Sequence, residues 1–227
     1  MLHVLASGAV TINFGNSLAK PSASVLIILA GAVLSIAPSL LILLTGFVRI
    51  IIVLGLARQA LGLQTTPPNQ VLVGIAFFIS LFLMEPTLAQ INHVALQPYL
   101  HGALSASSAI HHGEIPLKRW MLRQTGSQEL AFTSKVAHQN FQSHVMSTPL
   151  ATIIPAFLLT QLKSAFIIGF VIFVPFLIID LVVSATLMAM GVVMLPPTLV
   201  SLPFKLLLFI LVNGWMLVMQ TLVNSFR

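Results

Sequence analysis

Residues 149–195 read PLATIIPAFLLTQLKSAFIIGFVIFVPFLIIDLVVSATLMAMGVVML, and this tract decides the fold class. Lys163 and Asp180 are its only charged residues. A helix needs about 20 apolar residues to cross a bilayer. As one straight helix the tract would be about 70 Å long, more than twice the hydrocarbon core of about 30 Å. This membrane-type segment must therefore kink, fold back or leave the membrane plane, with Pro155 and Pro175 as the expected kink points.

The composition of the whole chain agrees with a membrane protein. Of 227 residues, 58% are hydrophobic and only 6% are charged. A soluble domain carries about a quarter charged residues, so lipid or a large complex must cover much of this surface. The net charge of +6 comes from ten Lys/Arg against four Asp/Glu. Because the basic residues stand singly among apolar ones, without the basic stripe that nucleic acid requires, we do not expect nucleic-acid binding.

Another apolar tract, residues 25–63, is also long enough to span a bilayer. It is interrupted by Pro38, Arg49 and Arg58. Gly62 is the expected C-terminal cap, and Arg58 in the last turn suits the negative end of a helix. No basic region precedes Lys20, so the sequence does not predict a cleavable signal peptide.

Two double prolines mark the tips of two predicted helical hairpins. Pro67-Pro68 cannot continue the first helix, and Asn69 is expected to cap the next one, which covers residues 71–84 and runs into Glu85. Pro196-Pro197 ends the long tract, and a last helix is expected from residue 203 to residue 226. If both hairpins start on one side of the membrane, both tips lie on the other side.

A more polar insert separates the hairpins and holds most of the histidines. Short amphipathic helices are expected in it at residues 117–122 and 129–136, joined by irregular loops. The sequence thus predicts an all-α membrane protein with two long helical hairpins and a small polar helical insert. The four expected segments are an N-terminal segment (1–23), the first hairpin (24–91), the insert (92–148) and the second hairpin (149–227).

Charges inside apolar segments are candidates for function because they are costly there. The candidates are Arg49, Lys163, Asp180 and Lys205. Asp180 is the only acid that we assign to a long apolar tract, whereas a proton path normally needs several titratable groups. We therefore favour an assembly contact, in which Asp180 pairs with a basic residue, over a proton relay or ion pathway.

The orientation in the membrane is not decided by charge. Arg58 and Lys205 flank the hairpin tips with no nearby acid in the sequence, which favours a cytoplasmic position. The insert, however, holds four Lys/Arg of its own.

The sequence gives no positive support for catalysis. It has no cysteine, no phosphate-binding loop, no nucleophile elbow and no HExxH motif. His111 and His112 are adjacent and point apart on a helix, and His138 and His144 lack a close third ligand. We expect no enzyme activity, no cofactor and no metal site.

Six strings, taken in their order and spacing, resemble the flagellar export-gate family FliP. They are GFVRIIIVL (46–54), RQALG (58–62), PPNQV (67–71), WMLRQT (120–125), PFLIID (175–180) and LPFKL (202–206), the last running on to Gly214-Trp215. The resemblance covers the chain from Pro38 to its C-terminus. The family is shared with the injectisome subunit SctR, and the strings around Arg49, Pro67 and Arg123 resemble the flagellar members more.

The resemblance implies a non-enzymatic core subunit of a type III export gate in the bacterial inner membrane, within the flagellar basal body. Several copies would assemble with two smaller membrane subunits into a conduit for unfolded export substrates, driven by a separate ATPase and the proton gradient. The family places the insert on the periplasmic side. Its long helices pack largely on one another above the membrane plane.

The resemblance also implies a seal just before the second tip. The family has a methionine triplet there, and this chain has Val192, Val193 and Met194, of which only Met194 matches. Flexible apolar side chains at a narrow ring close a pore by dewetting. Core or lipid-facing packing is the simpler reading of methionines here, and the seal is implied by the family alone.

Three alternatives stay open. An injectisome gate subunit is the nearest. A multispanning small-ion transporter or channel would use Asp180 and Arg49 as pathway charges, although such sites usually gather several polar ligands at broken helices. The third is a scaffold that only holds other secretion components.

Overall fold

The computed structural model describes residues 28, 31, 35, 42–138, 145–192 and 194–226. The chain divides into two units, Met1–Pro38 and Ser39–Arg227, and the second holds nearly all of these residues. It is helical, with no strand in the part that the structure describes, so the predicted all-α class is confirmed. Among the described residues, two helices are long and apolar enough to cross a membrane, or three if a bent pair forms one span.

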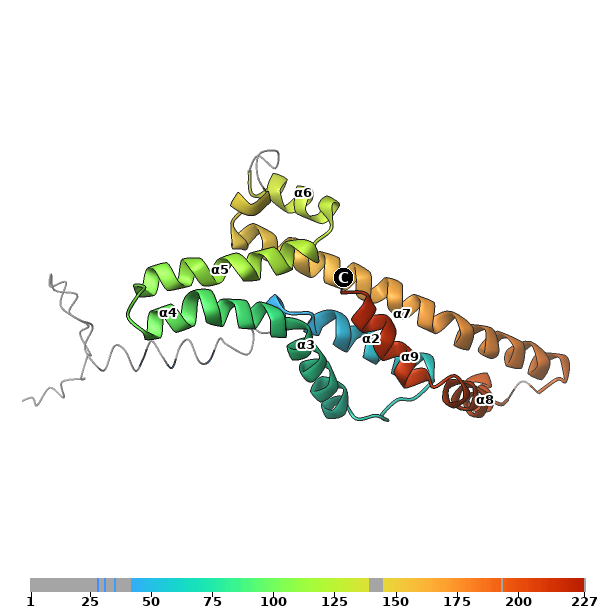
Figure 1. Ribbon diagram of the computed structural model, residues 1–227. Helices are drawn as coiled ribbons and strands as arrows, with labels where there is room; N and C mark the ends of the chain where they lie inside the picture. Colours follow the sequence, from blue (N-terminus) through green and yellow to red (C-terminus); the bar gives the residue numbers. More distant parts are fainter. Residues whose placement is uncertain are drawn as a thin grey trace, which may run out of the picture. The chain divides into compact units, whose positions relative to one another are not determined.

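The first hairpin consists of α2 (Phe47–Ala60) and α3 (Asn69–Ile91), shown in Figure 1. The loop begins at Gly62, whose φ of +77° suits the glycine predicted at this helix end. Pro68 is the N-terminal cap of α3, so the expectation that Asn69 caps this helix is wrong. The Asn69 side chain instead accepts a hydrogen bond from Arg58, which fixes the loop.

The second helix of this hairpin does not end at residue 91. It continues through a π-helical turn, Asn92–Leu96, and then α4 (Gln97–Leu100). Then α5 (Ala106–Arg123) runs back alongside it, and α6 (Ser127–Val136) and a short 3-10 turn (Val145–Ser147) follow (Figure 1). The insert therefore contains two helices that are longer than the short amphipathic stretches predicted from the sequence.

The long apolar tract forms one helix, α7 (Leu150–Ala189), which is 40 residues in length. At 1.5 Å per residue it is about 60 Å long. It continues through Pro155 and Pro175 and does not fold back (Figure 1). Gly169 lets it cross α2 closely, because a Cβ at this position would collide with the side chain of Leu56.

The expected single last helix is wrong. The chain forms α8 (Pro197–Leu211) and α9 (Gly214–Asn224), which are bent by 64° relative to each other. Asn213 has a left-handed φ of 51° and ends α8. The ring of Phe209 occupies the space beside Gly214, where a Cβ would collide with it. The bend between α8 and α9 thus brings α9 into contact with α2.

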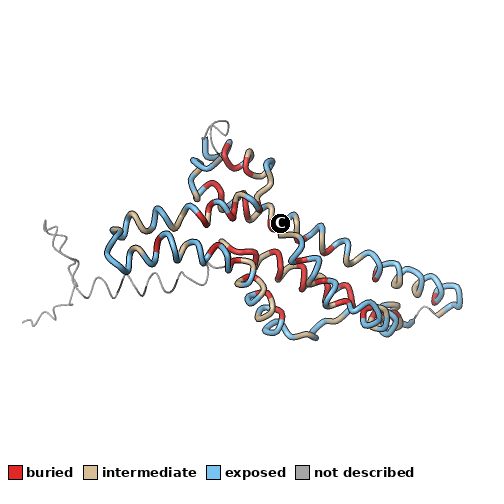
Figure 2. The backbone as a smooth tube through the Cα atoms, in the orientation of Figure 1, coloured by how far each residue is buried: buried red, intermediate tan, exposed pale blue. Residues whose placement is uncertain are grey.

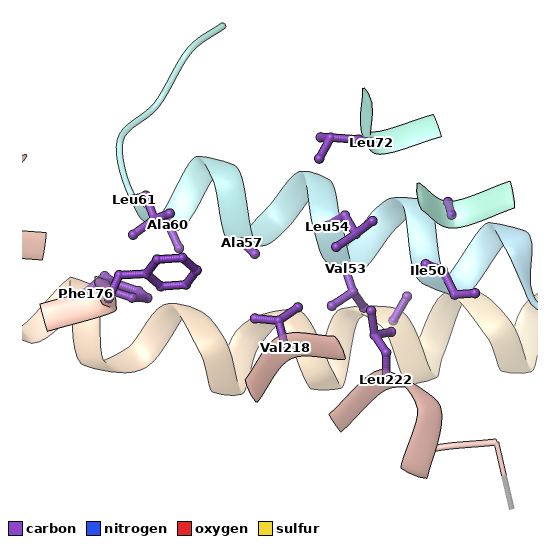
Figure 3. Close-up of a cluster of buried hydrophobic side chains, with 13 residues drawn as sticks. Ile50, Val53, Leu54, Ala57, Ala60, Leu61, Leu72, Phe176, Val218 and Leu222 are labelled. Carbon is purple, nitrogen blue, oxygen red and sulfur yellow. The ribbon is translucent and has the colours of Figure 1, made fainter. Parts of the chain in front are cut away.

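Helix α2 is the centre of the main core. Its residues Ile50, Val53 and Leu54 are fully buried and face α7, α9 and α3 (Figure 3). A second buried cluster joins α3, α5, α6 and the start of α7; it includes Met84, Trp120 and Phe157. Figure 2 shows that burial is concentrated around α2, whereas the far half of α7 and much of α8 are exposed.

Candidate functional site

The half-buried Asp180 and the buried Lys205 form a polar junction at the end of α2. Lys205 Nζ lies 2.6 Å from Asp180 Oδ2, and the other carboxylate oxygen accepts a hydrogen bond from Ser201 at 2.5 Å. Lys205 also donates to the carbonyl oxygen of Ala60 at 3.2 Å, so a cation lies at the negative end of α2. Lys205 is thus the basic residue that pairs with Asp180, although no acid stands near it in the sequence. The turn between α7 and α8 brings together residues that are 25 positions apart.

Arg49 is another buried charge, and the described residues that bind its side chain are neutral. Its Nε donates to Gln161 Oε1 at 2.8 Å, and its Nη1 donates to the carbonyl oxygen and the hydroxyl of Ser225 at 2.6 and 3.0 Å. The guanidinium carbon lies 4.0 Å from the ring centroid of Phe226. Gln161 in turn donates to the carbonyl of Gln124, at the end of α5. Arg49 thus ties α2 to α7, to the insert and to the end of α9.

Lys163, another of the candidate charges, has an acidic partner. Its Nζ lies 2.9 Å from Glu129 Oε1, which joins α7 to α6 of the insert. The hydrogen bond from Lys163 and a backbone hydrogen bond lower the pKa of Glu129. The backbone N–H of Gly126 also donates to Thr160 on α7. These contacts dock the insert on the first turns of the long helix.

The two hairpin tips meet. Arg58 donates to the carbonyl oxygen of Pro67 and to Asn69 Oδ1, which holds the first tip. Pro196 caps α8, and Pro197 is its first residue. Residues of both tips line one pocket of about 460 Å³, namely Arg58, Gln59, Gly62, Leu63, Gln64, Thr198, Leu199 and Leu202.

The three residues of the expected seal lie between α7 and the second tip. Met194 is 95% exposed, and Val192 is half-buried. Val193 lies outside the described residues. Met188 and Met190, which precede them, are also exposed, and an apolar cleft of about 520 Å³ lies between α7 and α8 nearby. This end of the molecule therefore presents flexible apolar side chains that its own chain does not cover.

Sequence reasoning missed Glu85 as an acid within a long apolar helix. We took the apolar stretch to end there, but α3 continues past it. Glu85 is exposed on a helix that is long and apolar enough to cross a membrane. The sequence could have indicated this helix surface, because Phe78, Phe82 and Glu85 have the spacing of residues on one face of a helix.

The histidines are not gathered into a site in the part of the chain that the structure describes, where no group of three or more potential metal ligands occurs. Nδ1 of His101 lies 2.7 Å from the carbonyl oxygen of Gln97, and Nδ1 of His112 lies 2.7 Å from that of Ser108. Both contacts are local, within one helical turn.

The sequence profile of the FliP family matches residues 30–222. The chain belongs to the FliP family. Its relatives include three proteins named flagellar biosynthetic protein FliP. The one from Bacillus subtilis is 46% identical over 205 residues, covering 90% of this chain and 93% of the relative. Those from Caulobacter vibrioides and Aquifex aeolicus are 42% and 43% identical, covering 98% and 86% of this chain and 84% and 82% of the relatives.

Membership of the FliP family explains the six strings noted in the sequence and places the chain among proteins of flagellar biosynthesis. It is a component of the flagellar export apparatus. Together with its long apolar helices, this makes it a membrane protein of the flagellar apparatus.

Proposed function

We propose that this chain is a non-enzymatic core subunit of the flagellar type III export gate. Several copies assemble with two smaller membrane subunits in the bacterial inner membrane, within the basal body. The assembly encloses a conduit for unfolded flagellar export substrates, and residues 192–194 of each copy contribute to its seal.

One observation carries the proposal: the apolar surface of α7 is too extensive for lipid alone to cover. Only 11% of the most apolar window of α7 is buried within the chain. The helix is about 60 Å long, whereas the hydrocarbon core is about 30 Å thick. Exposed apolar side chains follow the helix from Leu159 to Met188, over about 44 Å, so part of this exposed surface must be covered by protein, as in an assembly of several subunits.

The contacts of the buried charges favour this function over a small-ion transporter. Asp180 is paired with Lys205, and Arg49 is bound by Gln161 and Ser225. Each charge thus joins helices, and these contacts do not converge on a ligand site with several polar groups, as transporter sites do. The flagellar names of the relatives favour the flagellar apparatus over the injectisome.

The proposal is tested by purifying the tagged protein in mild detergent and measuring the mass of the complex. We expect a large complex that contains several copies of this chain and two smaller membrane proteins. A monodisperse monomer that transports a substrate alone in vesicles would contradict the gate and favour a transporter.

A further inference from the structure

The outer face of α3 carries two phenylalanines and a glutamate in one line. Phe78, Phe82 and Glu85 are spaced four and three residues apart, so they lie on the same face of the helix. Phe78 is 62% exposed and Phe82 is 77% exposed, and Glu85 is exposed one turn further along the helix. Large aromatic side chains are enriched at the centres of interfaces, where acidic residues are rare, so a glutamate among them calls for a partner.

Glu85 differs from the other three acids of the chain. Glu114, Glu129 and Asp180 each form an ion pair, with Lys118, Lys163 and Lys205 respectively. Glu85 forms no hydrogen bond or ion pair with any residue that the structure describes. A carboxylate on the surface of such an apolar helix is costly unless it is paired or protonated. The chain itself does not supply the partner in the described part.

A complementary face lies on α5. Arg119 and Arg123 are one helical turn apart and both exposed, and neither forms a hydrogen bond or ion pair within the described residues. The two arginines lie at about the same height along the packed helices α3 and α5 as Glu85. Met84, which precedes Glu85, and Trp120, which follows Arg119, pack in the same buried cluster.

We propose that Glu85 of one copy of this chain pairs with Arg119 and Arg123 of the neighbouring copy. The ring of Phe82, one turn from Glu85, stacks on a guanidinium of the same pair, because arginine binds carboxylates and aromatic faces alike. Since each copy carries both faces at one level, the contact is head-to-tail and continues from copy to copy around a ring or a shallow helix. The inference rests on the proposed assembly of several copies.

Charge exchange tests the pairing. Glu85→Arg and Arg123→Glu should each lower the recovery of the complex about tenfold, because like charges then face each other across the contact. The double variant should restore recovery in large part. Lys135→Glu, which reverses an exposed cation on α6, is the matched control and should leave recovery unchanged. If Glu85→Gln and Glu85→Arg both assemble like the native chain, Glu85 faces lipid or solvent and the pairing is wrong.

Cross-linking distinguishes contacts between copies from contacts within one chain. The chain has no cysteine, so Glu85→Cys and Arg119→Cys introduce the only thiols. The two variants are made on separately tagged chains and joined in the assembled complex by a short bis-maleimide, since a Glu–Arg contact separates Cα atoms by more than a disulfide allows. We expect a product that carries both tags. Ser107→Cys in place of Arg119→Cys should give none.

The outcomes separate this inference from the proposed function. A complex of full mass without the mixed product overturns the pairing and leaves the gate standing. A product in which the Glu85→Cys chain is joined to a smaller subunit likewise overturns the pairing and leaves the gate standing. The absence of any complex in mild detergent from the native chain overturns the gate itself.

Discussion

Arg49 Nε lies 2.8 Å from Gln161 Oε1, although the two residues are 112 positions apart. Both side chains are buried, at 3% and 0% exposure. Among the described residues no carboxylate contacts this buried guanidinium, which depends on hydrogen bonds to neutral oxygens and on the ring of Phe226. This junction joins both hairpins, the insert and the end of α9.

Arg49→Met should destabilise the protein. It leaves Gln161 Oε1 and the Ser225 carbonyl oxygen without their donor, and each orphaned buried group costs about 1–3 kcal/mol. The midpoint of thermal unfolding in detergent should fall by several degrees, at about 2–4 °C per kcal/mol for a chain of this size. Gln161→Glu should raise the midpoint, since a carboxylate then faces the guanidinium. Equal midpoints for native and Arg49→Met proteins would show that the junction does not stabilise the fold.

Asp180→Ala should prevent assembly of the complex. Lys205 is then left in a buried position without its carboxylate, and breaking a buried ion pair from one side typically costs about 3–5 kcal/mol. Asp180→Asn should be milder, because its oxygen still accepts from Ser201 or Lys205. Asp180→Leu combined with Lys205→Met should recover stability relative to Asp180→Ala, as thermal unfolding would measure. Normal assembly of Asp180→Ala with loss of proton-coupled export would instead indicate a relay.

Acidification should loosen the contact of α6 with α7. The pKa of Glu129 is lowered in the folded protein, so its stabilising effect is complete above the unfolded pKa of about 4.3 and is lost as the pH falls through the lower folded value. Hydrogen exchange of α6 amides, normalised to those of the α2 core, should rise between about pH 6 and about pH 3. Glu129→Gln should exchange faster than the native chain at about pH 6, approach it at about pH 3 and lose this pH dependence. An unchanged pH dependence in Glu129→Gln would exclude this pair as its cause.

Replacement of Val192, Val193 and Met194 by glycine should make cells leak small ions. Met194 makes almost no packing contact within the chain, being 95% exposed, so assembly should persist. A hydrophobic constriction that closes by dewetting is lost when its side chains are removed. Growth under salt stress and membrane permeability measure the leak, with the amount of complex checked in parallel. A triple methionine variant should seal at least as well as the native chain, and a tight glycine variant would place the seal elsewhere.

Much of the fold could be predicted from local properties of the sequence. The apolar length of residues 149–195 required a long membrane-type helix, and the double prolines at 67–68 and 196–197 required turns, because proline cannot continue a helix. The break at Asn213 could not be seen in this way. It depends on the fit of the Phe209 ring beside Gly214, which is a contact and not a propensity.

Composition and hydrophobic periodicity are local properties of the sequence, and they suffice to identify an apolar helical protein with two proline-marked tips and few charges. The pairing of the charges depends on how the helices pack in three dimensions. The α7–α8 turn pairs Lys205 with Asp180, the crossing of α2 and α7 places Arg49 against Gln161, and the continuation of α3 leaves Glu85 on an exposed helix face. Hydrogen bonds and ion pairs act over a few ångströms, so partners that are far apart in the chain are decided by how its helices pack.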